Sequence, residues 1–223
     1  MTEKKVTGLP HERRSAPALL SLVCPCYNEQ GSLNEFSARI RDSLTPSGQP
    51  YEIVFVNDGS TDGTLAEMHA LAEIEGNITI VNLTRNFGKE IALTAGLCHA
   101  AGDAVVVIDA DLQDPPELIL VFIEKYCDGY DIAYGRRIER RGDSWLKRAT
   151  AGAFYSIMSR MGTVEVPTNV GDFRLMSRRS LDALLRLPEH HRFMKGLFAW
   201  IGYPSVAVDY ARAPRFAGTT KWN

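Results

Sequence analysis

The chain has 223 residues, of which 45% are hydrophobic and 23% are charged, and its formal net charge at pH 7 is −2. These values are typical of one sizeable globular domain, and the near-neutral balance indicates neither a nucleic-acid binder nor an acidic tail. The charge is uneven, however: residues 1–111 carry 8 Lys or Arg against 15 Asp or Glu, and residues 112–223 carry 17 against 12. This asymmetry suits a site that holds a cation beside an anionic substrate, and it equally suits ordinary uneven surface charge.

Residues 1–17 read MTEKKVTGLPHERRSAP, which has no apolar core and is therefore not a signal peptide. We predict that they form a flexible lead-in to the domain. The sequence contains no run of 18 apolar residues, so none of it is predicted to cross a membrane. The four cysteines have neither zinc-ligand nor thioredoxin spacing, which indicates reduced thiols in a reducing compartment.

From residue 18 onward, short runs rich in β-branched residues alternate with helical patterns. The predicted strands are ALLSLVCP, YEIVFVND, NITIVNL, AVVVIDAD, DIAYG and SVAVDYA, and helical patterns lie at about residues 32–43, 62–75, 89–101 and 114–127. This rhythm predicts an α/β fold in which a mostly parallel central sheet carries helices on both faces. Ligands of such sheets bind beyond the carboxyl ends of the strands, where CPCYNE, VNDGSTD, LTRNFGKE and DADLQD all fall.

Beyond residue 135 the rhythm changes. Residues 144–161 place their apolar side chains on one helical face, which predicts a helix packed on the sheet; a helix lying on a membrane surface is the alternative. The sequence shows no internal repeat, low-complexity tract or linker, so residues 18–223 are predicted to form one domain.

Four carboxylates crowd into the segment VVVIDADLQDPPELI, directly after a buried strand. Asp114 precedes two prolines, and Glu117 follows it by three residues. An Asp at the N-cap, a Pro at the first helical position and a Glu at the third are typical of a helix start. We therefore predict that Asp114 and Glu117 begin a helix and have only a local structural role.

Asp109 and Asp111 have no such explanation. They flank Ala110 at the exit of the strand, and two carboxylates so close together repel unless a cation or a shared proton lies between them. Oxygen ligands suit Mg²⁺ or Mn²⁺, which commonly use one or two carboxylates together with substrate phosphates. We predict a metal site there, in which Gln113 adds a neutral oxygen or orients a water.

Two other strand ends carry polar groups that suit a nucleoside. In VNDGSTDGT, Thr61 or Asp62 is predicted to cap a helix, whereas the acceptor groups of Asn57 and Asp58 suit a base or a ribose. CPCYNE offers Tyr27 for stacking on a base and Glu29 as an acceptor. Each of these signals is weak when it is taken alone.

Seven blocks taken in chain order, PCYNE, VNDGSTDGT, LTRNFGKE, DADLQDPPE, GDFRLMSR, RFMKGLFAWIGY and RFAGTTKW, resemble glycosyltransferase family 2. Within that family the chain is similar to the polyprenyl-phosphate glycosyltransferases, the group that contains dolichol-phosphate mannose synthase and the bactoprenol glucosyltransferases. The resemblance covers about residues 18–222 and implies a GT-A fold, a nucleotide-sugar donor and a divalent metal, Mg²⁺ or Mn²⁺. The motif positions that it assigns to the donor nucleotide are Pro25, Tyr27, Glu29, Asp58, Asp109 and Ala110. Those that it assigns to the metal are Asp109, Asp111 and Gln113.

The implied reaction passes a sugar to the phosphate of a long-chain polyprenol, with inversion at the anomeric carbon and release of a nucleoside diphosphate. The resemblance to the bacterial members favours a UDP-sugar as the donor, with UDP-glucose as one candidate, and the sequence does not identify the sugar. The acceptor is a phosphate that is already ionised near neutral pH, so it needs cations more than it needs a strong base. The candidate phosphate-binding cations are Arg136, Arg137, Arg148, Arg215 and Lys221. The candidate catalytic carboxylates are Asp111 and Asp172, and Asp172 is expected to orient the phosphate or its arginines.

Members of this group usually continue into membrane-embedded helices, whereas this sequence stops at Asn223. The resemblance implies action at the cytoplasmic face of a bacterial membrane and is compatible with a homo-oligomer in the anchored form. One alternative is a family 2 enzyme with a soluble or polysaccharide acceptor, in which Asp172 would act as a general base. A second alternative is a non-catalytic nucleotide- or metal-binding module, which would bind without turnover.

Overall fold

The computed structural model describes residues 6–7, 10–138, 169–189 and 194–212. Within these residues the strands form one eight-stranded sheet in the order β1-β8-β6-β7-β5-β2-β3-β4. The strands are β1 (Val6–Thr7), β2 (Leu20–Cys26), β3 (Tyr51–Asn57), β4 (Ile78–Asn82), β5 (Ala104–Val107), β6 (Ile132–Arg137), β7 (Val170–Ser177) and β8 (Ser205–Tyr210). The predicted helix at residues 144–161 lies outside the described residues.

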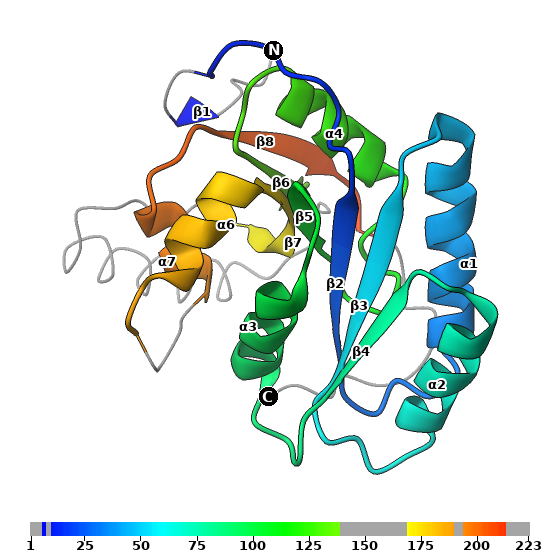
Figure 1. Ribbon diagram of the computed structural model, residues 1–223. Helices are drawn as coiled ribbons and strands as arrows, with labels where there is room; N and C mark the ends of the chain where they lie inside the picture. The colour runs from blue at the N-terminus through cyan, green and yellow to red at the C-terminus, as the bar shows by residue number, and fades with distance from the viewer. Residues whose placement is uncertain (1–5, 8–9, 139–168, 190–193, 213–223) are drawn as a thin grey trace.

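The helices connect these strands and cover both faces of the sheet (Figure 1). They are α1 (Leu33–Leu44), α2 (Thr64–Ile74), α3 (Lys89–His99), α4 (Leu118–Cys127), α6 (Arg178–Leu185) and α7 (Met194–Trp200), with a short 3₁₀ turn at Thr45–Ser47. The periodicity therefore placed the first four helices correctly to within a few residues. None of the helices in the described part of the chain is long and apolar enough to cross a membrane.

The predicted mostly parallel sheet is confirmed. Strands β5, β2, β3 and β4 lie side by side in parallel, as a strand-helix-strand rhythm requires. Strand β7 was not among the predicted strands, and it runs antiparallel between β5 and β6. Because of this reversal, β7 begins at the edge of the sheet where β5 ends.

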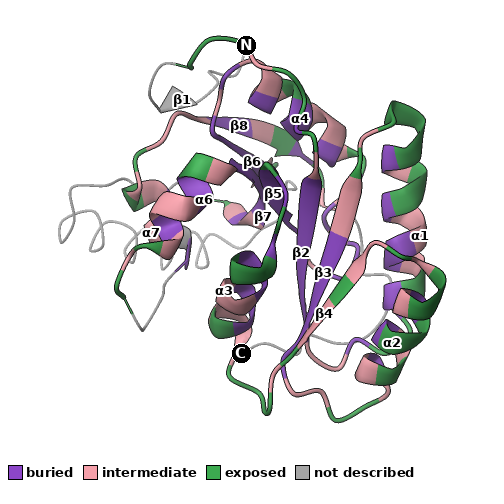
Figure 2. Cartoon of the chain, in the orientation of Figure 1, coloured by how far each residue is buried: buried purple, intermediate pink, exposed green. Residues whose placement is uncertain are grey.

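The core consists of two layers, one on each face of the sheet. Alternate residues of the central strands point to opposite faces, so that Leu22 and Cys24 pack under α1, α2 and α4, whereas Val23 packs under α3, α6 and α7. Figure 2 shows β2 and β3 as largely buried and the outer sides of the helices as exposed. A sheet buried on both faces provides a rigid support for the loops at its edges.

The residues that we predicted to be a flexible lead-in instead pack along the domain where they are described. Strand β1 pairs with β8, and the backbone N–H of His11 donates to Gly129 O at 3.0 Å. Arg14 donates to the carbonyls of Tyr126 and Tyr130 and lies 3.4 Å from Asp131.

Asp131 joins three separate segments at the start of β6. Its side chain is fully buried, and it accepts hydrogen bonds from Arg179 Nε and Ser177 Oγ, both at 2.7 Å, in addition to the contact with Arg14. Burial raises the pKa of Asp131, but the bonds from Arg179 and Ser177 and the nearby guanidinium charges lower it by more, so the pKa lies below its usual value. The ionised carboxylate therefore stabilises the fold.

A second buried carboxylate, Asp58, fixes the loop that precedes α3. Its Oδ1 accepts from Phe87 N at 2.8 Å and its Oδ2 accepts from Gly88 N at 2.9 Å. The neighbouring Gly59 has φ +64°, and a Cβ at this position would lie 2.3 Å from the backbone carbon of Arg85. The chain before α3 thus lies against the end of β3, and the first turn of the helix is placed accordingly.

We expect Asp131→Asn to lower the free energy of unfolding by about 2 kcal/mol at neutral pH, because it removes charge-assisted bonds from a buried acceptor. The native pKa of Asp131 is lowered, so its contribution is present above the usual aspartate pKa of about 3.9 and is lost as the pH falls through the native pKa. Denaturant titrations should show that the difference in free energy of unfolding between the variant and the wild type is smaller at pH 3 than at pH 7. Asp182→Asn, at a half-exposed pair with Arg178, is the control and should change stability by less than about 0.5 kcal/mol.

We expect Asp58→Ala to destabilise the protein by about 3 kcal/mol, because two backbone N–H groups lose their acceptor. Hydrogen exchange at the amides of Phe87 and Gly88 should accelerate in this variant. Asp62→Ala, which removes the acceptor of Thr64 N at the start of α2, should cost about 1 kcal/mol and leave those two amides unchanged. Unchanged exchange at Phe87 and Gly88 in Asp58→Ala would contradict the assigned role of Asp58.

Candidate active site

The predicted carboxylates of the site gather where the parallel strands end. Asp109 and Asp111 follow β5, and Asp172 lies near the start of the reversed strand β7. Val107 pairs with Arg174 in the antiparallel ladder, and continuing that register by two residues on each strand places Asp109 opposite Asp172. The reversed direction of β7 therefore brings together two carboxylates that are far apart in the sequence.

Lys89 lies between these two carboxylates. Its Nζ is 2.7 Å from Asp109 Oδ1, 2.9 Å from Asp109 Oδ2 and 2.8 Å from Asp172 Oδ2. Burial alone would lower the pKa of Lys89, but the two carboxylates offset this effect and hold the pKa above its usual value. The ammonium is thus a permanent cation at the centre of the site.

Lys89 belongs to the LTRNFGKE block of the family resemblance, but no role was predicted for it from the sequence. A signal was available in its position: Lys89 is the first residue of α3, where the helix dipole disfavours a positive charge. A lysine at that position needs anionic partners from elsewhere in the fold. Those partners come from β5 and β7, which no local pattern in the sequence connects with α3.

Asp111 is oriented by the turn that follows β5. It is 6% exposed, and its Oδ1 accepts from Gln113 N at 3.1 Å across Leu112, which has φ +56°. Its Oδ2 lies 4.0 Å from Arg212 Nη2 at the end of β8. Gln113 therefore contacts Asp111 through its backbone N–H, whereas its predicted role as a metal ligand would use the side chain.

The prediction that Asp114 and Glu117 begin a helix through side-chain capping is wrong. Helix α4 begins at Leu118, and its N-cap makes no side-chain cap hydrogen bond. Asp114 is instead buried at the site, where it accepts from the Tyr210 hydroxyl and lies 3.7 Å from Arg137. Hydrogen bonding to Tyr210 of β8 and the nearby charge of Arg137 of β6 hold this carboxylate away from the helix start. Glu117 points to the surface and pairs with Arg39 at 2.7 Å.

The pair formed by Asp114 and Tyr210 has a distinct electrostatic character. Burial is the main cause that raises the pKa of Asp114, and the Tyr210 hydrogen bond and Arg137 counteract it only in part. Burial and the adjacent Asp114 raise the pKa of Tyr210 to about 12. Tyr210 therefore remains a neutral hydrogen-bond donor at physiological pH.

Arg174 fixes the backbone that carries Asp172. It is 4% exposed, it donates to the carbonyls of Gly171 at 2.8 Å and Asp172 at 3.2 Å, and its guanidinium lies 3.7 Å above the Phe198 ring. Burial lowers its pKa to about 10, so it stays charged near neutral pH. Arg174 thus connects the start of β7 to α7.

The predicted donor residues surround the same edge of the sheet. Pro25 and Ala110 are buried, Tyr27 is half-buried and Glu29 is 6% exposed. Asn57, interpreted as a reader of a base or ribose, is 2% exposed, donates to Asn82 Oδ1 at 2.7 Å and accepts from Ser60 N at 3.1 Å. Its amide therefore has a structural role, and both oxygens of Asp58 accept from backbone N–H groups, as described above.

The predicted acceptor cations are only partly within the described residues. Arg136 forms a bidentate pair with Asp209 on the neighbouring strand, at 2.5 and 2.9 Å. Arg137, the next residue of β6, points to the opposite face of the sheet, where its guanidinium contacts Tyr210 and Asp114. Arg148, Arg215 and Lys221 lie outside the described residues.

The donor atoms at this edge suit a hard divalent cation that is completed by its substrate. Asp109 already orients both oxygens toward a cation, the ammonium of Lys89. Within residues 6–7, 10–138, 169–189 and 194–212, no group of three or more His, Cys, Asp or Glu side chains is arranged to hold a metal. The arrangement fits Mg²⁺ or Mn²⁺ bound through one or two carboxylates and the phosphates of a ligand.

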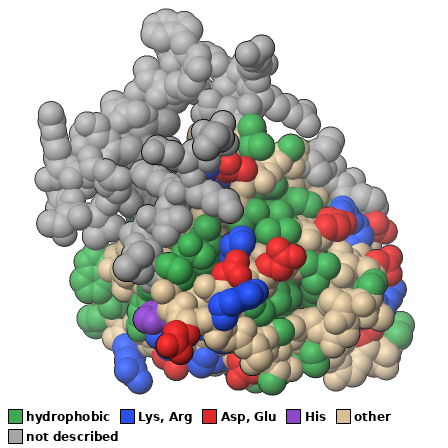
Figure 3. Space-filling view, turned by 90° about the horizontal axis from the view of Figure 1, so that it is seen from above, with side chains coloured by type: hydrophobic (Ala, Val, Ile, Leu, Met, Phe, Trp, Pro, Cys, Tyr) green, Lys and Arg blue, Asp and Glu red, His purple; other side chains and the backbone are tan. Residues whose placement is uncertain are grey.

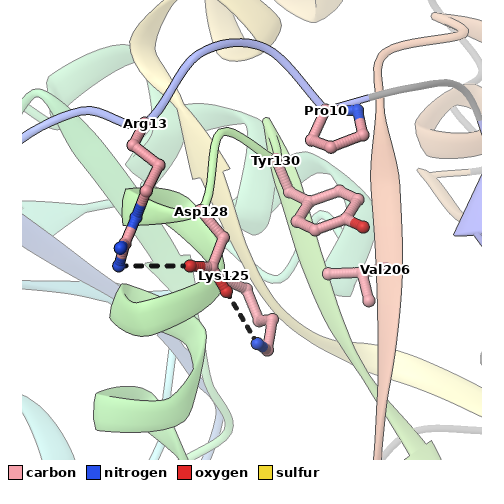
Figure 4. Close-up of a pocket in the computed structure, with 6 residues that line it drawn as sticks. All are labelled: Pro10, Arg13, Lys125, Asp128, Tyr130 and Val206. Carbon is pink, nitrogen blue, oxygen red and sulfur yellow. Dashed lines mark hydrogen bonds and ion pairs between the residues drawn. The ribbon is translucent and has the colours of Figure 1, made fainter.

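A separate pocket of about 440 Å³ lies at the opposite edge, where β6 and β8 begin (Figure 4). The Asp128 carboxylate there lies 2.8 Å from Lys125 and 3.5 Å from Arg13, so both cations already have an anionic partner. On the face seen from above, Figure 3 shows acidic and basic side chains interspersed among hydrophobic ones. Neither observation indicates a second anion-binding site.

Comparison with known proteins identifies relatives of the whole described fold. Residues 21–185 match the model of the glycosyl transferase family 2. The chain is 52% identical over 204 residues to the uncharacterized glycosyltransferase sll0501 of Synechocystis sp., covering 92% of this chain and 64% of that protein. It is 45% identical over 204 residues to the bactoprenol glucosyl transferase of Shigella phage SfV, covering 92% of this chain and 66% of that protein. The chain therefore spans about two thirds of the length of these relatives.

Solved structures agree on the fold. The mannosyltransferase PcManGT of Pyrobaculum calidifontis in complex with GDP-Man and Mn²⁺ superposes with a TM-score of 0.63 at 24% identity, covering 90% of this chain and 57% of that one. The glucosyl-3-phosphoglycerate synthase of Mycobacterium tuberculosis with Mn²⁺, UDP and phosphoglyceric acid gives 0.59 at 21% identity, covering 90% and 72%. The predicted GT-A fold is confirmed, and the chain belongs to glycosyl transferase family 2.

Proposed function

We propose that the protein transfers a hexose from a nucleotide sugar to a polyprenyl phosphate, with inversion at the anomeric carbon and release of a nucleoside diphosphate. The observation that carries the proposal is the juxtaposition of Asp109, Lys89 and Asp172 beyond the ends of β5 and β7. Relatives 44–45% identical to this chain are named bactoprenol glucosyl transferases, which supports a polyprenyl phosphate as the acceptor and glucose as the transferred sugar; UDP-glucose is the donor that we propose. The reaction would take place at the cytoplasmic face of a bacterial membrane, and residues 18–223 would form its catalytic domain.

The proposed donor site uses the side chains that follow β2, β3 and β5. Tyr27 would stack on the base and Glu29 would accept from the nucleoside, while Asp109 and Asp111 would lie at the diphosphate. Mg²⁺ or Mn²⁺, held by these two carboxylates, would neutralise charge that develops on the leaving diphosphate. The Lys89 ammonium lies close enough to Asp109 to contribute to the same neutralisation.

On the acceptor side, the attacking oxygen belongs to a phosphate that carries its own negative charge. Asp172 already contacts the Lys89 ammonium at 2.8 Å, and Arg174 fixes its backbone. This arrangement favours Asp172 as an orienting group rather than a proton acceptor. Arg148 and Lys221 are the proposed phosphate-binding cations, together with Arg136 or Arg137.

The proposal is tested by incubating the protein with UDP- and GDP-hexoses, Mg²⁺ or Mn²⁺ and a short polyprenyl phosphate, and then measuring lipid-linked sugar. Transfer should require the phosphate, so the matching polyprenol should give no product. Transfer to a soluble glycan instead would establish the alternative acceptor class. Nucleotide binding without transfer to either acceptor would indicate the non-catalytic module.

We expect Asp109→Asn and Asp111→Asn each to lower the transfer rate by about 100-fold or more, because each removes a carboxylate that would hold the metal against the negative charge of the leaving diphosphate. Glu117→Gln is the matched control from the same segment, since its exposed carboxylate pairs only with Arg39 among the contacts described. Its rate should equal that of the wild type. Near-normal metal-dependent transfer by either aspartate variant would refute the metal assignment.

We expect Arg148→Ala to raise KM for polyprenyl phosphate by about tenfold, the effect of losing one charge-assisted contact, with little change in KM for the donor. Arg140→Ala, a charge change in the same basic segment with no assigned ligand, serves as the control. Initial rates measured while each substrate is varied separately distinguish the two effects. A larger change in KM for the donor than in KM for polyprenyl phosphate would contradict the assignment of Arg148 to the acceptor phosphate.

A further inference from the structure

Lys89 binds the same carboxylate, Asp109, that is proposed to hold the metal. Its ammonium contacts both oxygens of Asp109, at 2.7 and 2.9 Å, and its side chain is 21% exposed. A divalent cation that binds this carboxylate therefore competes with a cation that is covalently part of the chain. The competition makes metal binding weaker than the carboxylates alone would allow.

The backbone that carries Lys89 is fixed, while the end of the side chain is not. Asp58 holds the N–H groups of Phe87 and Gly88, directly before Lys89, and Gly59 packs against the backbone of Arg85. A lysine side chain has four rotatable bonds beyond this anchor. The ammonium can therefore leave one partner without any movement of α3.

A second partner is available at the same distance. Asp172 Oδ2 lies 2.8 Å from Nζ, so an ammonium that gives up Asp109 still has a carboxylate partner. An exchange of this kind leaves no buried charge without compensation, which would otherwise be costly. The two carboxylates can therefore bind the Lys89 ammonium alone, or the ammonium at Asp172 together with a metal at Asp109.

We propose that Lys89 is an exchangeable internal cation that holds Asp109 and Asp172 together before the metal binds, then gives up Asp109 to the metal and keeps Asp172. Lys89 is thus a positioning residue that makes tight metal binding depend on the donor diphosphate. The inference deepens the proposed function, on which it rests for the identity of the donor. The proposal predicts an unusual combination for a variant that lacks the Lys89 charge: such a variant should bind the metal more tightly and yet transfer the sugar more slowly.

The test measures Mn²⁺ binding by electron paramagnetic resonance of free Mn²⁺, with and without UDP or GDP, in Lys89→Met and the wild type. Lys89→Met should bind Mn²⁺ alone about tenfold more tightly, because an opposing charge has been removed, and nucleotide should enhance its affinity less than in the wild type. Its melting temperature in EDTA should fall and should recover when Mn²⁺ is added, since the two carboxylates then lack a cation. Lys89→Arg, which keeps the charge, should bind Mn²⁺ like the wild type.

Lys125→Met is the matched control, because it removes an equivalent lysine–aspartate contact of 2.8 Å at the opposite edge of the sheet. It should change neither the Mn²⁺ affinity nor its dependence on nucleotide. Lys89→Gln, which keeps a donor without the charge, replaces Lys89→Met if that variant fails to fold. Unchanged or weaker Mn²⁺ binding in the folded neutral variant would overturn the proposal.

The outcomes also separate this inference from the proposed function. Tighter Mn²⁺ binding in Lys89→Met, combined with no transfer by the wild type to polyprenyl phosphate, would support the cation exchange and refute the proposed acceptor. Normal transfer by the wild type, combined with no gain in Mn²⁺ affinity in Lys89→Met, would support the proposed acceptor and refute the cation exchange. Slower transfer by Lys89→Met at saturating Mn²⁺, with unchanged KM for the donor, would support the retained contact with Asp172.

Discussion

Carboxylates that face each other at the edge of a buried sheet need a cation between them, and this requirement organises the carboxyl edge of the protein. Asp109 and Asp172 share the Lys89 ammonium, and the neighbouring Asp114 has Tyr210 as donor with Arg137 nearby. Each compensating group comes from a different strand or helix. The acidic residues of the site are therefore held in place by the assembled fold rather than by their own segment.

Local periodicity was sufficient to predict much of this fold. Strands β2 to β5 and helices α1 to α4 alternate in the sequence, so their order, their parallel pairing and the edge at which ligands bind follow from chain connectivity. The same reasoning located Asp109 and Asp111 at a strand exit. Two side chains so close to each other and to a buried strand indicate a cation even when their neighbours in space are unknown.

The parts that escaped prediction depend on contacts between distant segments. The sequence around Asp114 is typical of a helix cap, but a tyrosine from β8 and an arginine from β6 hold its carboxylate away from that role. Lys89 has no local reason to begin a helix, and the reason becomes visible only when β5 and β7 lie beside it. Strand β7 itself was recognised only as a motif, because a reversed strand interrupts the rhythm on which the other assignments relied.

The reversed strand also determines when the site can come into existence during folding. The β2–β3 and β3–β4 pairs join strands that are close in the chain, whereas both partners of β5, strands β2 and β7, lie more than sixty residues away from it. Pairing at such separation carries a larger loop-closure entropy and is slow compared with local contacts. A chain that has formed only its first parallel strands already has Asp58 and Lys89 near their final places, but it lacks Asp172. Contact order therefore predicts that Asp109 and Asp172 come together late in folding, so that catalytic activity would report the pairing of β5 with β7.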